Sequence, residues 1–263
     1  MYETRYHRPR TLSEATALFT PDARYIAGGQ TLLPTMKQRL AAPSDLIDIA
    51  RLAELRGIAA SAATLTIGGG MTHAEVASSD VAKRAIPALA ALAALIGDPA
   101  VRHLGTLGGS LANNDPAADY AAAALALDAT IHTDRRTIAT GDFFQGLFTT
   151  ALAEGEIIVR VAFQAPEKAA YEKFRNPASR YAIAGAFVAR GPNGVRVAIT
   201  GAGNNGAFRA TDIEQALTRQ WSPAAIDAVT IDESTMLGDI HATPAYRANL
   251  VKVTAKRALA KAG

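Results

Sequence analysis

The chain has 263 residues, of which 49% are hydrophobic and 19% are charged, which is the composition of a globular rather than a disordered protein. Its 27 basic and 24 acidic residues leave a formal charge of +3, too small an excess to make a nucleic-acid surface by itself. The absence of cysteine excludes disulfides, a thiolate nucleophile, and zinc or iron–sulfur clusters held by cysteine.

Other residue patterns exclude further classes. The five histidines are scattered without ligand-like spacing, so we expect no metal site, and no arrangement of side chains indicates a catalytic group. Residues 1–10 contain no apolar signal core, and the longest apolar run, residues 86–96, is too short to span a bilayer. We therefore expect a soluble, cytoplasmic chain, with any membrane contact peripheral to the inner membrane face.

The first 165 residues are predicted to alternate short helices and strands. Thr11 or Ser13 is expected to cap the first helix, and Thr72 with Glu75 matches a capping box. Helices are expected at residues 11–14 onward, 31–40, 72–78, 81–95 and 119–127. Strands are expected at residues 24–27, 45–49, 57–60, 64–67, 129–133 and 156–163. Residues 97–116 form a glycine-rich segment for which no helix or strand is predicted.

A domain boundary is predicted near residue 165. Beyond it, strands are expected at residues 171–174, 182–190 and 195–200, with a hairpin turn at residues 191–194. Helices are expected at residues 211–219, 223–229 and 244–261. Strands followed by helices favour an α+β class for this half.

The first candidate binding segment is residues 25–33, where a predicted strand ends in Gly28 and Gly29 and a helix begins at once. Glycines allow close approach of the backbone and a positive φ. The start of the helix offers unpaired N–H groups and a partial positive charge. Together these features suit a phosphate, although a tight turn without a ligand has the same pattern.

The second candidate segment, residues 105–119, combines glycines with hydroxyl, amide and carboxylate side chains. Hydroxyl and amide donors beside close-approach glycines suit a pyrophosphate, and a carboxylate such as Asp119 suits sugar hydroxyls. The alternative is a polar loop that caps the helix at 119–127. Two glycine-rich polar loops in one small domain are more than tight turns usually require.

A third segment matches a nucleotide-binding motif only by its residues, and we call it the decoy. Residues 201–206 match G-x-G-x-x-G between a strand and a helix. No parallel strand ending in an acidic residue follows about twenty positions later, so we interpret the segment as a loop of a strand–helix layer. His73 follows a similar glycine run and is expected to be a surface or packed histidine rather than a ligand.

Residues 27–33, 106–110 and 115–119 resemble the paired FAD motifs of the molybdenum hydroxylases. The likeness is greatest to the flavoprotein medium subunits of the carbon monoxide dehydrogenase type, and the xanthine dehydrogenase flavin domain is a more distant relative. It extends to residues 6–15, 96–119, 155–158 and 171–185. The sequence departs from the family pattern at Asn114, where many members have a small residue, and at residues 175–180.

The resemblance implies an FAD-binding domain of the vanillyl-alcohol-oxidase type at residues 1–165, with subdomains at about 1–54 and 55–165. It implies a smaller α+β domain at residues 166–263, with a three-stranded antiparallel sheet and helices. The overall fold class expected is therefore α+β.

The resemblance also implies the flavin contacts. The first loop would wrap the diphosphate and the nearby ribityl chain through Ala27, Gly28, Gly29, Gln30, Thr31 and Leu32. The second loop would approach through Thr106, Gly108, Gly109 and Ser110, while Asn113 and Asp119 would hold sugar or ribityl hydroxyls. Ile96 matches an adenine-side segment, and Ile158 an apolar position near the adenine or the flavin edge. Lys173 and Tyr181 match positions near the isoalloxazine ring.

The implied function is an electron relay by FAD. Electrons would come from the [2Fe–2S] clusters of a small subunit, which receives them from a molybdenum cofactor in a large subunit, within a dimer of heterotrimers. FAD would pass them to an external acceptor. One alternative is a stand-alone flavin oxidoreductase of the same fold, and another is an assembly subunit that has lost flavin.

Overall fold

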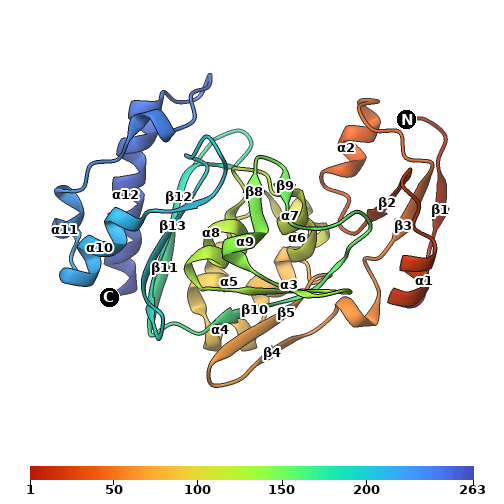
Figure 1. The fold of residues 1–263 in the computed structure, drawn as a ribbon, viewed down its shortest axis with the longest axis horizontal. Coiled ribbons are helices and arrows are strands. Elements are labelled where there is room, and N and C mark those ends of the chain that lie inside the picture. Colours follow the sequence, from red (N-terminus) through yellow and green to blue (C-terminus); the bar gives the residue numbers. More distant parts are fainter.

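The computed structural model describes residues 1–263, and three blocks follow one another along its longest axis (Figure 1). The N-terminal block is a three-stranded parallel sheet in the order β1-β3-β2. Its elements are β1 (Arg5–His7), α1 (Leu12–Ala17), β2 (Ala23–Ile26), α2 (Leu32–Lys37), β3 (Asp45–Asp48) and the 3-10 turn η1 (Ala53–Leu55). Thr11 caps α1, because its side chain accepts a hydrogen bond from the Glu14 N–H.

Helix α2 is shorter than the predicted helix at residues 31–40. Met36 is buried on its inner face, but Leu40 lies beyond the helix and is 76% exposed. The chain leaves the helix at Arg39, which has a φ of +62°. The expectation that the helix continues to Leu40 is therefore wrong.

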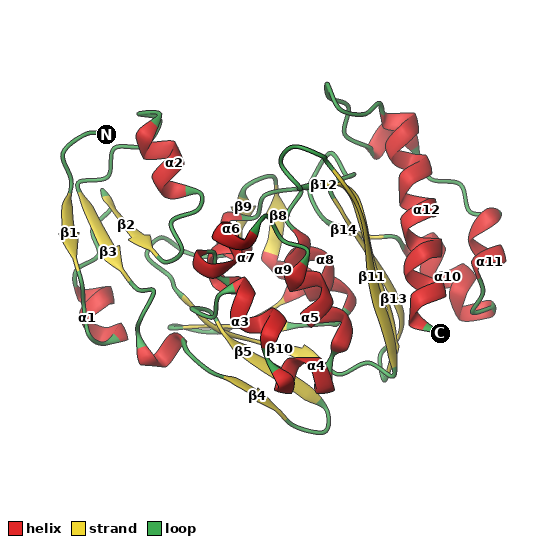
Figure 2. Ribbon diagram, turned by 180° about the vertical axis from the view of Figure 1, so that it is seen from behind, coloured by secondary structure: helices red, strands yellow, loops and turns green.

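The middle block is a five-stranded antiparallel sheet in the order β4-β5-β10-β6-β7, and helices pack against it (Figure 2). Its strands are β4 (Ile58–Ala60), β5 (Thr64–Gly68), β6 (Thr130–Thr133), β7 (Thr137–Ala139) and β10 (Ile158–Gln164). Its helices are α3 (His73–Ser78), α4 (Asp80–Ala85), α5 (Pro87–Ala94), α6 (Pro99–Leu104), α7 (Leu107–Asn113), α8 (Asp119–Ala126) and α9 (Thr140–Phe143), and β8 (Phe144–Gly146) pairs with β9 (Thr149–Thr150).

Two of these helices, α6 and α7, lie in the glycine-rich segment 97–116, where no helix was predicted. Asp98 caps α6 by accepting a hydrogen bond from the backbone, and Pro99 occupies the first turn. Thr106 caps α7 by accepting a hydrogen bond of 3.1 Å from the Gly109 N–H. Caps and packing outweigh the low helix propensity of the glycines in α7.

The C-terminal block is an antiparallel sheet in the order β11-β12-β13-β14, with helices on its outer side. Its strands are β11 (Lys168–Arg175), β12 (Ala182–Gly191), β13 (Gly194–Thr200) and β14 (Phe208–Arg209), and its helices are α10 (Thr211–Arg219), α11 (Pro223–Asp227), η2 (Glu233–Thr235) and α12 (Pro244–Ala262). The three expected strands are present, and the two-residue β14 adds a fourth.

The C-terminal sheet has a core on each face. Tyr171 and Phe187 join the core of the middle block, whereas Val188 and Val197 pack with the helices α10 and α12. The chain thus changes sheet after Gln164 without a break in the main core. None of the helices is both long and apolar enough to cross a membrane.

Candidate functional site

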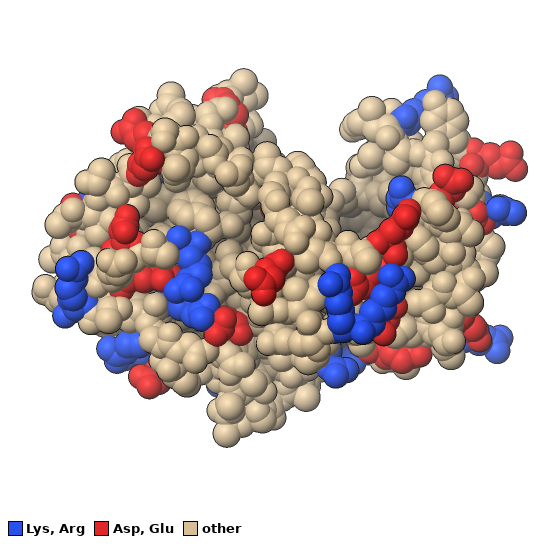
Figure 3. Space-filling view, in the orientation of Figure 1, with Lys and Arg blue, Asp and Glu red and all other residues tan.

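A cleft of about 810 Å³ lies between the N-terminal and middle blocks, and Figure 3 shows the surface hollowed between them. The β11–β12 turn also contributes to its wall. Fifteen of the sixteen candidate residues line it, namely Ala27, Gly28, Gly29, Gln30, Thr31, Leu32, Ile96, Thr106, Gly108, Gly109, Ser110, Asn113, Asp119, Ile158 and Tyr181. The sixteenth, Lys173, does not line the cleft but bonds to Asp119 in its wall.

The first glycine loop offers free backbone donors. Residues 28–32 line the cleft in a row, and none of their backbone N–H groups donates to an acceptor within the chain. A concave run of N–H groups is suited to an anion. Gly29 has a φ of +67°, the left-handed region that favours glycine.

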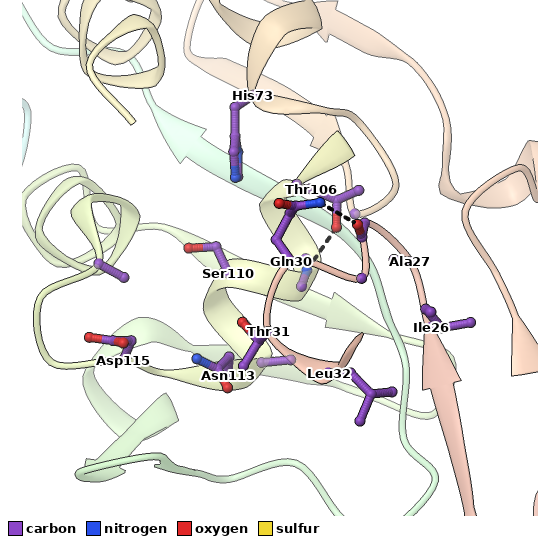
Figure 4. A pocket seen from close by; sticks show the side chains of 18 of the residues that line it. Ile26, Ala27, Gln30, Thr31, Leu32, His73, Thr106, Ser110, Asn113 and Asp115 are labelled. Carbon is purple, nitrogen blue, oxygen red and sulfur yellow. Dashed lines mark hydrogen bonds between the residues drawn. The ribbon is translucent and has the colours of Figure 1, made fainter. Parts of the chain in front are cut away.

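Gly28, in the same loop, allows a close contact with another segment of the backbone. A Cβ there would overlap the Leu104 carbonyl oxygen and lie 2.6 Å from the Gly105 Cα. Both neighbours are backbone, which cannot move aside easily. Gly28 therefore lets the first loop touch the turn between α6 and α7, and this contact brings the two glycine loops together (Figure 4).

The second glycine loop has already used its backbone donors. The N–H groups of Leu107, Gly108 and Gly109 donate to Met71 O, Gly69 O and Thr106 Oγ1. A Cβ at Gly108 would lie 2.8 Å from Gly69 O, so that glycine serves packing. A Cβ at Gly109 would meet only Thr106 Oγ1, at 2.9 Å, and no other atom within 4 Å.

What the second loop presents to the cleft is therefore an open glycine face and side chains. Gly109 is exposed, and the side chains of Ser110 and Asn113 line the cleft without a hydrogen bond to any other part of the chain. Figure 4 shows both side chains projecting from α7. A hydroxyl and an amide in these places can bind phosphate or sugar oxygens.

Asp119 lies at the base of the cleft in a buried polar cluster. The Tyr171 hydroxyl donates to its Oδ1 at 2.5 Å, and the Lys173 ammonium lies 2.9 Å from the same oxygen. Burial raises the pKa of Asp119, although the charge of Lys173 opposes this shift. Lys173 also donates to the Leu95 carbonyl and is only 2% exposed at its side chain. The protein thus holds Asp119 firmly before any ligand binds.

The far end of the cleft is formed by Asp115 and the β11–β12 turn. Tyr181, which is 48% exposed, stands at this rim, and burial of part of its ring raises the pKa of its hydroxyl. Asn176 organises the turn by accepting hydrogen bonds from the Ala178 and Ser179 N–H groups. Burial also raises the pKa of Asp115.

Sequence reasoning missed several cleft residues, among them Gly69, His73, Asp115 and Arg180. Asp115 begins the motif at residues 115–119 but was not assigned a flavin contact, because an aspartate before a proline is an ordinary turn residue. His73, expected to be a surface or packed histidine, is buried in the wall of the cleft. The decoy at residues 201–206 joins β13 to the antiparallel β14, and none of its residues lines the cleft.

The arrangement suits a dinucleotide. Free N–H groups and the open face of Gly109 can receive a diphosphate, and Ser110, Asn113 and Asp119 offer partners for hydroxyl groups. Apolar side chains such as Ile96 and Ile158 also line the cleft, where they can pack against the rings of a nucleotide or a flavin.

Residues 2–166 match the family model described as the FAD binding domain in molybdopterin dehydrogenase. The chain belongs to this family. It is 35% identical to the carbon monoxide dehydrogenase medium chain of Hydrogenophaga pseudoflava, over 97% of this chain and 95% of that one. It is 32% identical to the nicotine 6-hydroxylase medium subunit of Paenarthrobacter nicotinovorans, over 98% and 97% of the two chains.

The fold agrees with this membership. The solved carbon monoxide dehydrogenase of Hydrogenophaga pseudoflava superposes with a TM-score of 0.89 over 99% of this chain and 97% of that chain, at 35% identity. The chain is thus an FAD-binding medium subunit of the molybdenum hydroxylase type, and an oxidoreductase subunit. The residues present fit FAD, because the open face of Gly109 and the unpaired N–H groups of residues 28–32 line the same cleft, and a diphosphate needs both.

Proposed function

We propose that the chain relays electrons through one non-covalently bound FAD, from [2Fe–2S] clusters of a partner subunit to an external acceptor. The observation that carries the proposal is the meeting of five free N–H groups with the open face of Gly109 in one cleft. With no cysteine, the chain has no thiol for a covalent flavin link. FAD supplies the electron-transfer chemistry, and the protein binds and orients it.

In this proposal the N–H groups of residues 28–32 hold the diphosphate, and Ser110 and Asn113 bind oxygens beside it. Asp119 accepts hydrogen bonds from hydroxyl groups of the cofactor, using lone pairs that Tyr171 and Lys173 leave free. Ile158 and Ile96 cover ring faces. Tyr181 stands at the rim, where the redox-active ring would approach the surface.

The partners follow from what this chain lacks. Without cysteine it cannot hold a cysteine-bound iron–sulfur cluster, so such clusters must lie in another chain. Similar proteins are called medium chains or medium subunits, names that imply larger and smaller partners. We therefore propose an iron–sulfur small subunit and a molybdenum-binding large subunit, in a dimer of heterotrimers located in the cytoplasm.

The decisive experiment compares flavin reduction with and without the iron–sulfur partner. In the assembled complex, substrate should bleach the flavin absorbance only when that partner is present. Equally fast reduction of the isolated chain by a small molecule would favour a stand-alone flavin oxidoreductase. A purified chain without flavin absorbance, even after incubation with FAD, would favour an assembly subunit.

A further inference from the structure

His73 is built into the wall of the flavin cleft at the start of α3. Its backbone N–H donates to the Gly105 carbonyl at 3.0 Å, and its ring lies on the Cα of the same glycine. A Cβ at Gly105 would come within 2.6 Å of the His73 Nε2, so a glycine is needed there for the ring to fit. The side chain is 4% exposed and lines the cleft, and Figure 4 shows the ring directed into it.

Two buried polar atoms beside the cleft have no partner. They are the His73 Nδ1 and the hydroxyl of Tyr120 on α8, and both are shielded from solvent. The two rings are neighbours, with centroids 5.4 Å apart. A buried polar group without a hydrogen bond lowers stability, so two such groups in neighbouring rings demand an explanation.

The two groups make no direct hydrogen bond with each other, but a hydrogen-bonded bridge through one water would satisfy both. Burial lowers the pKa of His73 to about 4, aided by the charge of Arg102, so the imidazole is neutral near pH 7. A neutral imidazole has one donor and one acceptor nitrogen. If that water accepts from the Tyr120 hydroxyl and donates to Nδ1, the proton of the ring must be on Nε2, which lies at the Gly105 edge of the cleft.

We propose that His73 is a further FAD-binding residue, whose Nε2–H donates a hydrogen bond to an oxygen of the cofactor, and that Tyr120 is the positioning residue that fixes this tautomer. The inference rests on the flavin site proposed above. It explains the fully buried hydroxyl of Tyr120, a residue that does not line the cleft. FAD offers phosphate, carbonyl and hydroxyl oxygens, all of which accept hydrogen bonds.

Nitrogen NMR of the side chains tests the tautomer directly. In ¹⁵N-labelled protein, His73 should show the Nε2–H pattern near pH 7, and its Nε2 resonance should move when FAD is added to the flavin-free chain. In Tyr120→Phe, the tautomers should mix. An Nδ1–H pattern would overturn the proposal. An Nε2–H pattern that FAD leaves unchanged would also overturn it, because the pair would then serve packing or water only.

Affinity measurements test the same point independently. His73→Gln keeps a donor close to the Nε2 position and should change the FAD dissociation constant little. His73→Leu should raise that constant about three- to tenfold, the range of one neutral hydrogen bond. His132→Leu, at a histidine outside the cleft, is the matched control. Equal affinities for the Leu and Gln variants would contradict the proposal.

These outcomes separate the inference from the function on which it rests. If the Leu variant fails to fold, the NMR of the wild-type chain and the Gln variant still decide. If the wild-type chain binds FAD with no response at His73, only this inference fails. If the wild-type chain binds no FAD, the relay function fails first.

Discussion

In the first glycine loop, five backbone N–H groups in a row have no acceptor within the chain, whereas in the second loop Leu107, Gly108 and Gly109 each already donate to one. Both loops contain a Gly-Gly pair, and both line the same cleft. The first loop is therefore equipped to bind an anion through its backbone. The second is fastened to residues 69–71 and presents side chains and one open glycine.

The comparison also separates the glycines by role. A Cβ at Gly28 or Gly108 would strike the backbone of another segment, but at Gly109 it would meet only one side-chain oxygen and otherwise enter the cleft. A glycine motif thus mixes residues that bring segments together with residues that leave space for a ligand. Sequence alone does not distinguish them, because both uses require the same missing Cβ.

The largest expected effect concerns the buried ion pair between Asp119 and Lys173. Lys173→Met would leave the carboxylate of Asp119 buried without its cation. Removing one partner of a buried ion pair costs about 3–5 kcal/mol, and we expect a loss of this size in the free energy of unfolding. Urea unfolding of the flavin-free chain measures it. The double variant Asp119→Asn/Lys173→Met should recover much of the loss. A loss well below about 1 kcal/mol in Lys173→Met would show that Lys173 does not stabilise the buried carboxylate of Asp119.

The next effect concerns His73, which follows residues 69–71, the segment whose carbonyl groups accept hydrogen bonds from the second loop. Burial lowers the pKa of His73 to about 4 in the folded chain, below its unfolded value of about 6.5. As the pH falls from 6.5 toward 4, the unfolded chain binds the proton first, so stability that is complete above pH 6.5 is lost across this window. At about 1.36 kcal/mol per pKa unit the loss is about 3 kcal/mol.

The measurement is urea unfolding of the flavin-free chain at several pH values, for the wild type and His73→Gln. Carboxylates titrate in the same window, so the difference between the two proteins is the relevant quantity. That difference should change by about 3 kcal/mol between about pH 7 and pH 4. Parallel pH profiles would mean that His73 is not buried in its neutral form.

The contact between the two loops is tested by Gly28→Ala. The added methyl group would collide with the backbone at Leu104 and Gly105, so we expect the loops to separate. Overpacking of this kind costs about 1–3 kcal/mol in stability, and FAD binding should be lost with it. Flavin content after purification and urea unfolding measure the two effects. Retention of FAD at wild-type affinity would show that binding does not require this contact.

Much of this fold could be predicted because its signals are local. The Thr72–Glu75 capping box and the turn between β12 and β13 are both present where the residues indicate them. The helices α6 and α7 were not predicted. The glycines of α7 are poor helix formers, and this helix depends on the Thr106 cap and on the packing of Gly108 on Gly69. Helix α6 contains no glycine, and it begins with the Asp98 cap and Pro99. The pairing of His73 with Tyr120 joins residues far apart in the sequence and had no local signal at all.

A smaller effect tests the open glycine of the second loop. Gly109 has a helical backbone, so Gly109→Ala adds a methyl group at the cleft without backbone strain, and only the Thr106 hydroxyl, 2.9 Å from the added Cβ, must shift. We expect FAD affinity to fall about tenfold, which corresponds to about 1.4 kcal/mol. Flavin fluorescence titration measures it.

The matched control is Gly141→Ala. Gly141 is also a helical glycine with an exposed surface, nothing lies within 4 Å of its added Cβ, and it does not line the cleft. A glycine of the segment 201–206 would be a poorer control, because a Cβ at Gly203 would lie 2.6 Å from Gly206 O. Equal affinity losses in Gly109→Ala and Gly141→Ala would remove Gly109 from the binding site.

The smallest effect separates the two hydroxyls of the second loop. Thr106 uses its hydroxyl to cap α7, whereas the Ser110 hydroxyl has no partner in the chain. Thr106→Val should therefore lower the free energy of unfolding by about 1 kcal/mol, the usual cost of a lost cap. Ser110→Ala should leave stability unchanged and weaken FAD binding about threefold to tenfold, the range of one hydrogen bond. Urea unfolding and flavin titration of both variants show whether each hydroxyl serves stability or FAD binding. If Ser110→Ala instead lowered stability and left FAD affinity intact, the second loop would bind flavin only through the open face of Gly109, and the contrast with the N–H donors of the first loop would be sharper still.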